Sequence, residues 1–175
     1  MVHTVGHSTR TFDELAGILK DAGVRVLVDV RRHPFSRRHP QFSRDALAAG
    51  LQSSGIRYVH EPDLGGHREP RADSRNTAWR NPAFRGYADH MATPEFAQAL
   101  DRVAALSEAA VMCAEALPAR CHRQLLADAL ACRGVQVRHL LGGGRSEEHR
   151  LHPRARCHEG TVVYPAPGQL ELGAS

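Results

Sequence analysis

One short segment gathers most of the side-chain types in this chain that can do chemistry. The segment VMCAEALPARCHRQLL, residues 111–126, follows an apolar run that predicts a buried strand and precedes a pattern that predicts an amphipathic helix. Between the two lie thiol, carboxylate, imidazole and guanidinium groups: Cys113, Glu115, Cys121, His122 and Arg123. The first N–H groups of a helix favour an anion and a thiolate, so Cys121 is a candidate nucleophile or redox group.

Purely structural roles for these residues also remain open. Buried cysteine is most often a small apolar residue, so Cys113 is also a candidate for packing at a strand end. His122 is also a candidate for capping the helix or bonding the loop before it. A phosphatase loop is rejected, because six residues separate Cys113 from Arg120, too many to wrap one phosphate, and Glu115 would repel the anion.

Strands and helices alternate along the chain. Apolar runs predict strands at 2–5, 24–30, 56–60, 109–114 and 135–141, with helical periodicity between them and a capping box at Thr11 and Glu14. This order predicts an α/β fold of one domain, Rossmann-like or flavodoxin-like, with a mostly parallel five-stranded sheet and helices on both faces. Residues 1–141 form this domain. Residues 142–175 form a C-terminal arm, in which TVVYP at 161–165 adds one edge strand.

The polar ends of the predicted strands point to one site. Ligands of parallel α/β sheets bind beyond the carboxyl ends of the strands. A strand order of 3-2-1-4-5 makes the first and fourth strands neighbours and brings the turn at 6–8 opposite the turn after Cys113. The groups expected at this rim are His7, Ser8, Asp29, Arg31, His60, Glu61, Gly65, Gly66, Cys113, Glu115, Arg138 and His139.

The charge of the chain favours an anionic partner. The formal net charge is +4 and the isoelectric point is near 9.2, with arginine as the main source. Arginines and histidines at 31–39 form either a solvated loop or a phosphate clamp. Trp79 and Tyr87 are the better candidates for stacking on a base. The long polar stretch 61–81 is either a lid or a disordered connector.

Several classes of protein are disfavoured. The N-terminal residues lack a basic region and a long apolar stretch, which predicts no signal peptide, no membrane partner and a cytoplasmic location. The four cysteines, Cys113, Cys121, Cys132 and Cys157, have irregular spacing and are expected as thiols, with Cys132 as packing or surface. Twelve histidines supply possible metal ligands, but no zinc-type spacing occurs, so no metal or cofactor is assigned.

The same residues carry a family resemblance. The segments TVGHSTRTFDELAGILKDAGVRVLVDVRRHPFSRRHPQF, GIRYVHEPDLGG, AFRGYADHM, MCAEALPARCHRQLLADAL and GVQVRHL, over about residues 3–141, resemble the bacterial domain-of-unknown-function 488 family. The resemblance implies the fold and a rim site without a settled reaction. The positions that match its motifs are Gly6, His7, Ser8, Asp29, Arg31, Pro34, Gly65, Gly66, Arg85, Gly86, Tyr87, Cys113, Glu115, Cys121, His122 and Arg123.

The leading hypothesis is an enzyme that acts on an anionic substrate, a nucleotide or nucleic-acid component, at this rim. Arg31 and Arg123 would bind phosphate, and Cys121 or Cys113 would be the nucleophile. The remaining candidate roles are general acid or base for Asp29 or Glu115 and proton relay for His7.

Three alternatives stay open. Asp29 is equally a strand-end acid that fixes Arg31 by an ion pair. The chain as a whole is alternatively a non-catalytic nucleic-acid-binding module, whose binding would weaken steeply with salt. It is otherwise a thiol redox or metal-binding protein, which alkylation of Cys113 or Cys121 would inactivate.

Overall fold

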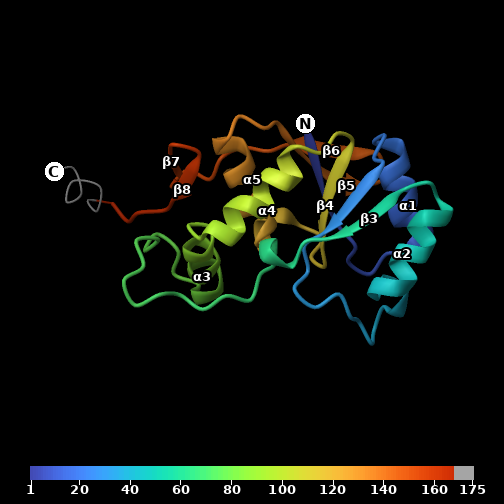
Figure 1. Cartoon of the computed structure of the whole chain (residues 1–175), viewed down its shortest axis with the longest axis horizontal. Helices are drawn as coiled ribbons and strands as arrows, with labels where there is room; N and C mark the ends of the chain where they lie inside the picture. Colours follow the sequence, from blue (N-terminus) through green and yellow to red (C-terminus); the bar gives the residue numbers. More distant parts are fainter. Residues whose placement is uncertain (168–175) are drawn as a thin grey trace.

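Six strands form the central sheet of the part of the chain that the computed structural model describes, residues 1–167, in the order β3-β2-β4-β1-β5-β6 (Figure 1). All neighbours pair in parallel except β6, which runs antiparallel to β5. The predicted α/β fold with a mostly parallel sheet is therefore confirmed. The strands are β1 (Val2–Gly6), β2 (Val26–Asp29), β3 (Arg57–His60), β4 (Ala109–Cys113), β5 (Val137–Gly142) and β6 (Arg145–Glu148).

Helices cover both faces of the sheet, as expected for strands that are apolar on both sides. One apolar cluster joins β-strand residues such as Leu27 and Met112 to the first two helices, and the other joins Val28 and Val111 to the last three. Figure 1 shows α1 and α2 on one side and α3, α4 and α5 on the other. The helices are α1 (Phe12–Asp21), α2 (Arg44–Ser53), α3 (Pro82–His90), α4 (Pro94–Ala104) and α5 (Arg123–Cys132), with short 3-10 turns at Pro40–Phe42, Pro62–Leu64 and Pro118–Arg120.

The strand order differs from the predicted 3-2-1-4-5, because β4 lies between β2 and β1. The predicted contact between the first and fourth strands is nevertheless present, with Gly6 opposite Cys113. Every residue of both β1 and β4 is buried. Hydrophobic patterning therefore could not decide which of these two central strands stands next to β2.

The segment between β3 and α3 is tied to α3 by a single buried carboxylate. Asp89 accepts hydrogen bonds from the Arg71 backbone N–H, the Ser74 hydroxyl and the Asn76 amide, at 2.6–2.9 Å. Trp79 packs its ring against Phe84, with centroids 5.0 Å apart. The stretch predicted as a lid or a disordered connector thus packs onto the helix that follows it.

The C-terminal arm is built differently from the prediction. The edge strand of the main sheet is β6, whereas the predicted strand at 161–165 contains β8 (Thr161–Val163), which pairs only with β7 (Arg156–His158) in a separate sheet. The last part of the predicted arm, residues 168–175, lies outside the described residues. Among the described residues, no helix is both long and apolar enough to cross a membrane.

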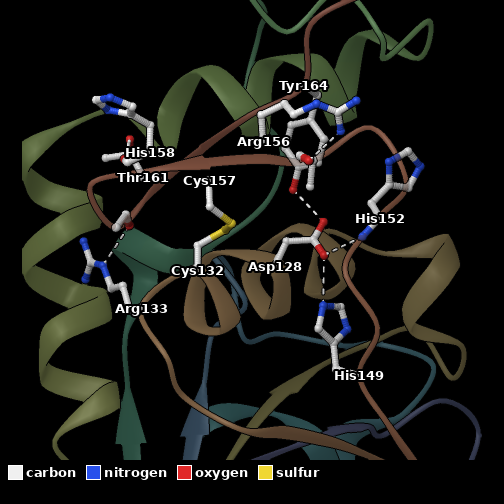
Figure 2. Close-up of a disulfide and its surroundings, with 12 residues drawn as sticks. Asp128, Cys132, Arg133, His149, His152, Arg156, Cys157, His158, Thr161 and Tyr164 are labelled. Carbon is white, nitrogen blue, oxygen red and sulfur yellow. Dashed lines mark hydrogen bonds and ion pairs between the residues drawn. A yellow bond between two sulfur atoms is a disulfide. The ribbon is translucent and has the colours of Figure 1, made fainter.

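A disulfide joins the arm to α5, so the expectation that all four cysteines are thiols is wrong for two of them. Cys132 at the end of α5 is bonded to Cys157 in β7, with Cα atoms 5.5 Å apart (Figure 2). The two cysteines lie 25 positions apart in the sequence. Only the folding of the arm over α5 brings them together, and irregular spacing carried no sign of this contact.

Asp128, in the middle of α5, holds the arm a second time. Its side chain is fully buried and accepts hydrogen bonds from His149 Nε2–H, the His152 backbone N–H and the Tyr164 hydroxyl, at 2.7–3.0 Å (Figure 2). Burial, followed by the Asp128 charge, raises the pKa of Tyr164 far above its ordinary value, so Tyr164 remains a donor. Val162 and Tyr164 of the arm are therefore part of the core, whereas β6 and β7 are exposed.

Candidate active site

A cavity of about 450 Å³ lies at the carboxyl ends of β1, β2 and β4. His7, Arg31 and Cys113 line it, each at or just beyond the end of its strand. The two turns expected to face each other are hydrogen-bonded, from His7 N–H to the Cys113 carbonyl at 3.0 Å and from Ser8 N–H to the Ala114 carbonyl at 2.9 Å. The expected shared rim is therefore present for β1, β2 and β4. Arg138 and His139 of β5 were expected there too, but they lie opposite His3 and Thr4 and do not line the cavity.

Two free thiols lie side by side at this cavity. Cys113 Sγ and Cys121 Sγ are 2.8 Å apart, and Cys121 Sγ lies 3.4 Å from His122 Nδ1. The hydrogen bond from the Cys113 thiol lowers the pKa of Cys121 most, and contacts from His122 and the Arg123 backbone N–H at the start of α5 act in the same direction against burial. The sulfur of Cys121 is therefore the thiolate of the pair.

Cys113 is the complementary partner. Burial raises the pKa of Cys113, and the hydrogen bond and charge of Cys121 raise it further. Its thiol consequently keeps its proton and donates it toward Cys121. Because Cys113 lines the cavity as well as packing in the core, neither its structural nor its chemical interpretation excludes the other.

Arg31 reaches the cavity because Asp29 holds it. Both oxygens of the fully buried Asp29 carboxylate accept from Arg31, Oδ1 from Nε at 2.8 Å and Oδ2 from Nη2 at 2.6 Å. The Tyr58 hydroxyl donates to the same Oδ2 at 2.8 Å. Asp29 does not line the cavity, so the geometry favours the ion-pair interpretation over an acid–base role.

His7 is a neutral imidazole in this arrangement. Burial lowers the pKa of His7 to about 4, and the charge of Arg31 adds to this effect. Nδ1–H donates to the Ser8 carbonyl at 3.0 Å, which leaves Nε2 to accept from Arg31 Nη1 at 3.3 Å. Ser8 adopts a left-handed backbone, with φ of 49°. Both residues thus shape the turn, and His7 presents an acceptor to Arg31.

Four residues that were predicted to bind or stack on a ligand do not line the cavity. Arg123, only 1% exposed, donates to the carbonyls of Glu115 and Ala116 at 2.6 and 3.0 Å, so its guanidinium group holds the loop after β4. Tyr87 is buried and donates to the Leu64 carbonyl, which removes it as a stacking platform. Arg85 does not line the cavity, and Trp79 packs in the core.

The glycine pair after β3 serves close packing. A Cβ at Gly65 would lie 2.9 Å from the Pro62 carbonyl, and one at Gly66 would lie 2.8 Å from His122 Nδ1. Gly66 lines the cavity where the His122 ring meets it. Gly66 therefore allows the segment after β3 to approach His122, and Gly65 allows it to pack closely on the Pro62 carbonyl.

Sequence reasoning missed several residues of the cavity. Arg120 lies just before Cys121 and was weighed only as part of a phosphatase loop. Asn81 and Phe84 come from the start of α3, where no strand ends, and so carried no signal. Phe35, 70% exposed, also lines the cavity and was not among the aromatic residues expected to stack on a ligand. An apolar ring within a run of arginines was the signal available for Phe35.

Exposed charges at the cavity are mainly cationic. Arg32 and Arg120 are exposed, Arg31 is nearly buried, and Glu115 is the exposed carboxylate among the lining residues. Within residues 1–167, no group of three or more histidine, cysteine, aspartate or glutamate side chains is arranged to hold a metal ion. The arrangement thus combines a thiolate with guanidinium groups that attract anions.

Comparison with known proteins identifies one relationship. The family described as "Domain of unknown function DUF488" matches residues 11–130, more than half of the chain. This range contains Asp29, Arg31, both free thiols and the start of α5. No curated protein and no solved structure matches the chain.

Proposed function

Because the chain belongs to the DUF488 family, whose description assigns no reaction, we propose from its own geometry that it is an enzyme with Cys121 as nucleophile toward an anionic substrate. The observation that carries the proposal is the position of the Cys121 sulfur. It lies at the start of α5, between the Cys113 thiol and the His122 ring, in a cavity. A thiolate held in this way attacks at neutral pH without a separate base.

The cationic side chains support an anionic substrate. Arg31 has its Nε and Nη2 occupied by Asp29, which leaves Nη1 toward the cavity beside His7. Arg32 and Arg120 add two exposed guanidinium groups. Guanidinium groups pair well with phosphate and carboxylate oxygens, and nucleotides and nucleic-acid components belong to this class.

Two further side chains suit such a substrate. The exposed Phe35 ring at the cavity offers a surface on which a base can stack. Glu115, exposed on the loop that Arg123 holds, is placed to exchange a proton with a leaving group. The two free thiols favour the reducing cytoplasm as the place of action, with Cys132–Cys157 as an exception to the usual rule.

Alkylation with a charged and a neutral reagent tests the proposal. For each thiol, the quantity compared is the ratio of the iodoacetate rate to the iodoacetamide rate. We expect this ratio to be higher for Cys121 than for a free thiol in solution. Arg32→Gln and Arg120→Gln should each lower the iodoacetate rate about three- to tenfold and leave the iodoacetamide rate nearly unchanged. Arg37→Gln is the matched control, because Arg37 is exposed but does not line the cavity.

The pH profile of the iodoacetamide reaction completes the test. Its midpoint should lie below the ordinary thiol range of about 8.5. A midpoint at or above that range, or equal preference for the two reagents in all variants, would rule out an anion-binding thiolate site.

A further inference from the structure

We propose that Cys113 and Cys121 form a working dithiol that reduces low-molecular-weight anionic disulfides, with Cys121 attacking and Cys113 resolving. The inference rests on the thiolate and the cations of the proposed function and adds a reaction to the same site. It concerns the pair, whereas the nucleophile alone needs only Cys121.

The distance between the sulfurs supports a reversible bond. Cys113 Sγ and Cys121 Sγ are 2.8 Å apart, and a disulfide bond is about 2.05 Å long. Closing the bond therefore requires a movement of less than about one ångström. Both cysteines flank the loop whose Glu115 and Ala116 carbonyls bind Arg123, so the loop brings the two sulfurs together before any reaction.

The asymmetry of the pair sets the order of the steps. Cys121 attacks first, because its sulfur is the thiolate. The hydrogen bond and the negative charge of Cys121 are two of the causes that raise the pKa of Cys113, after burial. Once Cys121 is bound in a mixed disulfide, its negative charge is gone, while the nearby Arg123 charge still lowers the pKa of Cys113. Formation of the mixed disulfide at Cys121 thus lowers the pKa of Cys113 and makes Cys113 the better nucleophile.

The steps balance with a disulfide as the co-reactant. The Cys121 thiolate forms a bond to one sulfur of the substrate disulfide, whose S–S bond breaks, and the first substrate thiolate leaves and takes a proton from water. Cys113 then bonds to Cys121 Sγ as the mixed disulfide breaks, and its proton passes to the second departing thiolate. The substrate gains two electrons and two protons, and the protein dithiol becomes a disulfide.

The second cysteine pair of α5 cannot take this role. Cys132 and Cys157 are already joined, and Cys157 lies on β7, away from the cavity. The Cys132–Cys157 disulfide therefore serves as an internal reference in any peptide map of the oxidised protein.

A series of disulfides that differ in charge tests the inference. The full chain, reduced at Cys113 and Cys121, is mixed with 3,3′-dithiodipropionate (anionic), bis(2-hydroxyethyl) disulfide (neutral) or cystamine (cationic). Peptide mapping at successive times then measures how much of Cys113 and Cys121 is free thiol, mixed disulfide or intramolecular disulfide. We expect a bond between Cys113 and Cys121 without a lasting adduct, formed about tenfold faster with the anionic reagent than with the cationic one.

Cys113→Ser is the decisive variant. Serine keeps a hydroxyl that donates to Cys121 but cannot form the second disulfide, so a mixed disulfide at Cys121 should accumulate. Cys113→Ala provides a second variant if the serine disturbs the core, and the unfolding midpoint of each reports on folding. A lasting adduct on wild-type Cys121, or equal rates with all three reagents, overturns the inference.

The outcome is separable from that of the proposed function. Wild type that is alkylated faster by iodoacetate but retains a mixed disulfide would refute the resolving role of Cys113 and leave the nucleophile in place. Wild type without selective alkylation would refute the nucleophile itself.

Discussion

The two ends of α5 carry two cysteine pairs in opposite states. At its start, Cys113 and Cys121 are unbonded, with sulfurs 2.8 Å apart, in a cavity lined by arginines. At its end, Cys132 is bonded to Cys157, and the bond fastens the C-terminal arm. One pair is separated by 8 positions and the other by 25. The state of a cysteine here follows from what surrounds it, whereas its spacing says little.

A buried chain of hydrogen bonds runs between these two regions. Arg123 donates to Thr4, Thr4 to His139 Nδ1, His139 Nε2–H to His149 Nδ1, and His149 Nε2–H to Asp128. Thr4 and both imidazoles each accept one hydrogen bond and donate one when the imidazoles are neutral. One hydrogen-bond network therefore connects the C-terminal arm to the loop after β4, although the thiols of the active site are not members of it.

Removal of the Asp128 carboxylate should have the largest effect on stability. In Asp128→Ala, three buried donors of the arm lose their acceptor, so we expect a loss of about 3–5 kcal/mol in the free energy of unfolding. Urea titration measures it. Asp101→Ala, which removes an exposed carboxylate paired with Arg133, should cost less than about 1 kcal/mol. Equal losses in the two variants would contradict the conclusion that the buried Asp128 carboxylate holds the arm on α5.

Removal of the disulfide should have the next largest effect. The variant Cys132→Ser with Cys157→Ser loses a cross-link over 25 positions, for which loop entropy predicts about 3 kcal/mol. Urea titration measures the loss, and the rate of Cys121 alkylation at neutral pH measures the site. We expect that rate to stay within about twofold of the wild type, since neither residue lines the cavity. A large change in the rate would show that the two regions are not separable.

Acid should weaken each of the two regions by a similar or smaller amount, through one buried imidazole in each. Burial lowers the pKa of His7, in the active site, and of His139, in the buried chain, to about 4, against an ordinary value near 6.5. The unfolded state therefore binds more protons between these values, and stability falls as the pH drops from about 6.5 to 4. Each ring contributes on the order of 3 kcal/mol, and no further loss from these groups follows below pH 4.

The measurement is the unfolding free energy of wild type and single variants across this pH range. His7→Gln and His139→Gln should each flatten the curve, whereas His158→Gln, which replaces an exposed ring, should leave its slope unchanged. A wild-type curve that is level from pH 6.5 to 4 would contradict neutral imidazoles at both positions.

The rim site could be predicted from the sequence because parallel strands bring their carboxyl ends to one edge. His7, Arg31 and Cys113 follow strands directly, and all three line the cavity. The ion pair of Asp29 with Arg31 was one of the two alternatives that the sequence left open, and the structure contains it. The position of Arg123 was also expected, but its contacts with main-chain carbonyls were not. A charged side chain near a strand end or helix start looks available to a ligand until main-chain carbonyls or an ion pair are seen to occupy it.

Other features had no local signal. Asn81 and Phe84 reach the cavity from a helix start, and the bond between Cys132 and Cys157 depends on the path of the arm. These contacts join segments far apart in the chain, and residue patterns report mainly on neighbours in sequence. The order of β1 and β4 was hidden for a different reason, because both strands are buried along their whole length.

The insertion of β4 between β2 and β1 bears on how the chain folds during synthesis. Strand β1 pairs only with β4 and β5, which begin at Ala109 and Val137. Strand β1 must therefore wait until the chain has been synthesised as far as β4 before it finds a partner. Sheets that depend on such distant pairing fold slowly and expose unpaired edges meanwhile. The arrival of β4 joins β1 to β2 and brings Cys113 to the rim in the same event.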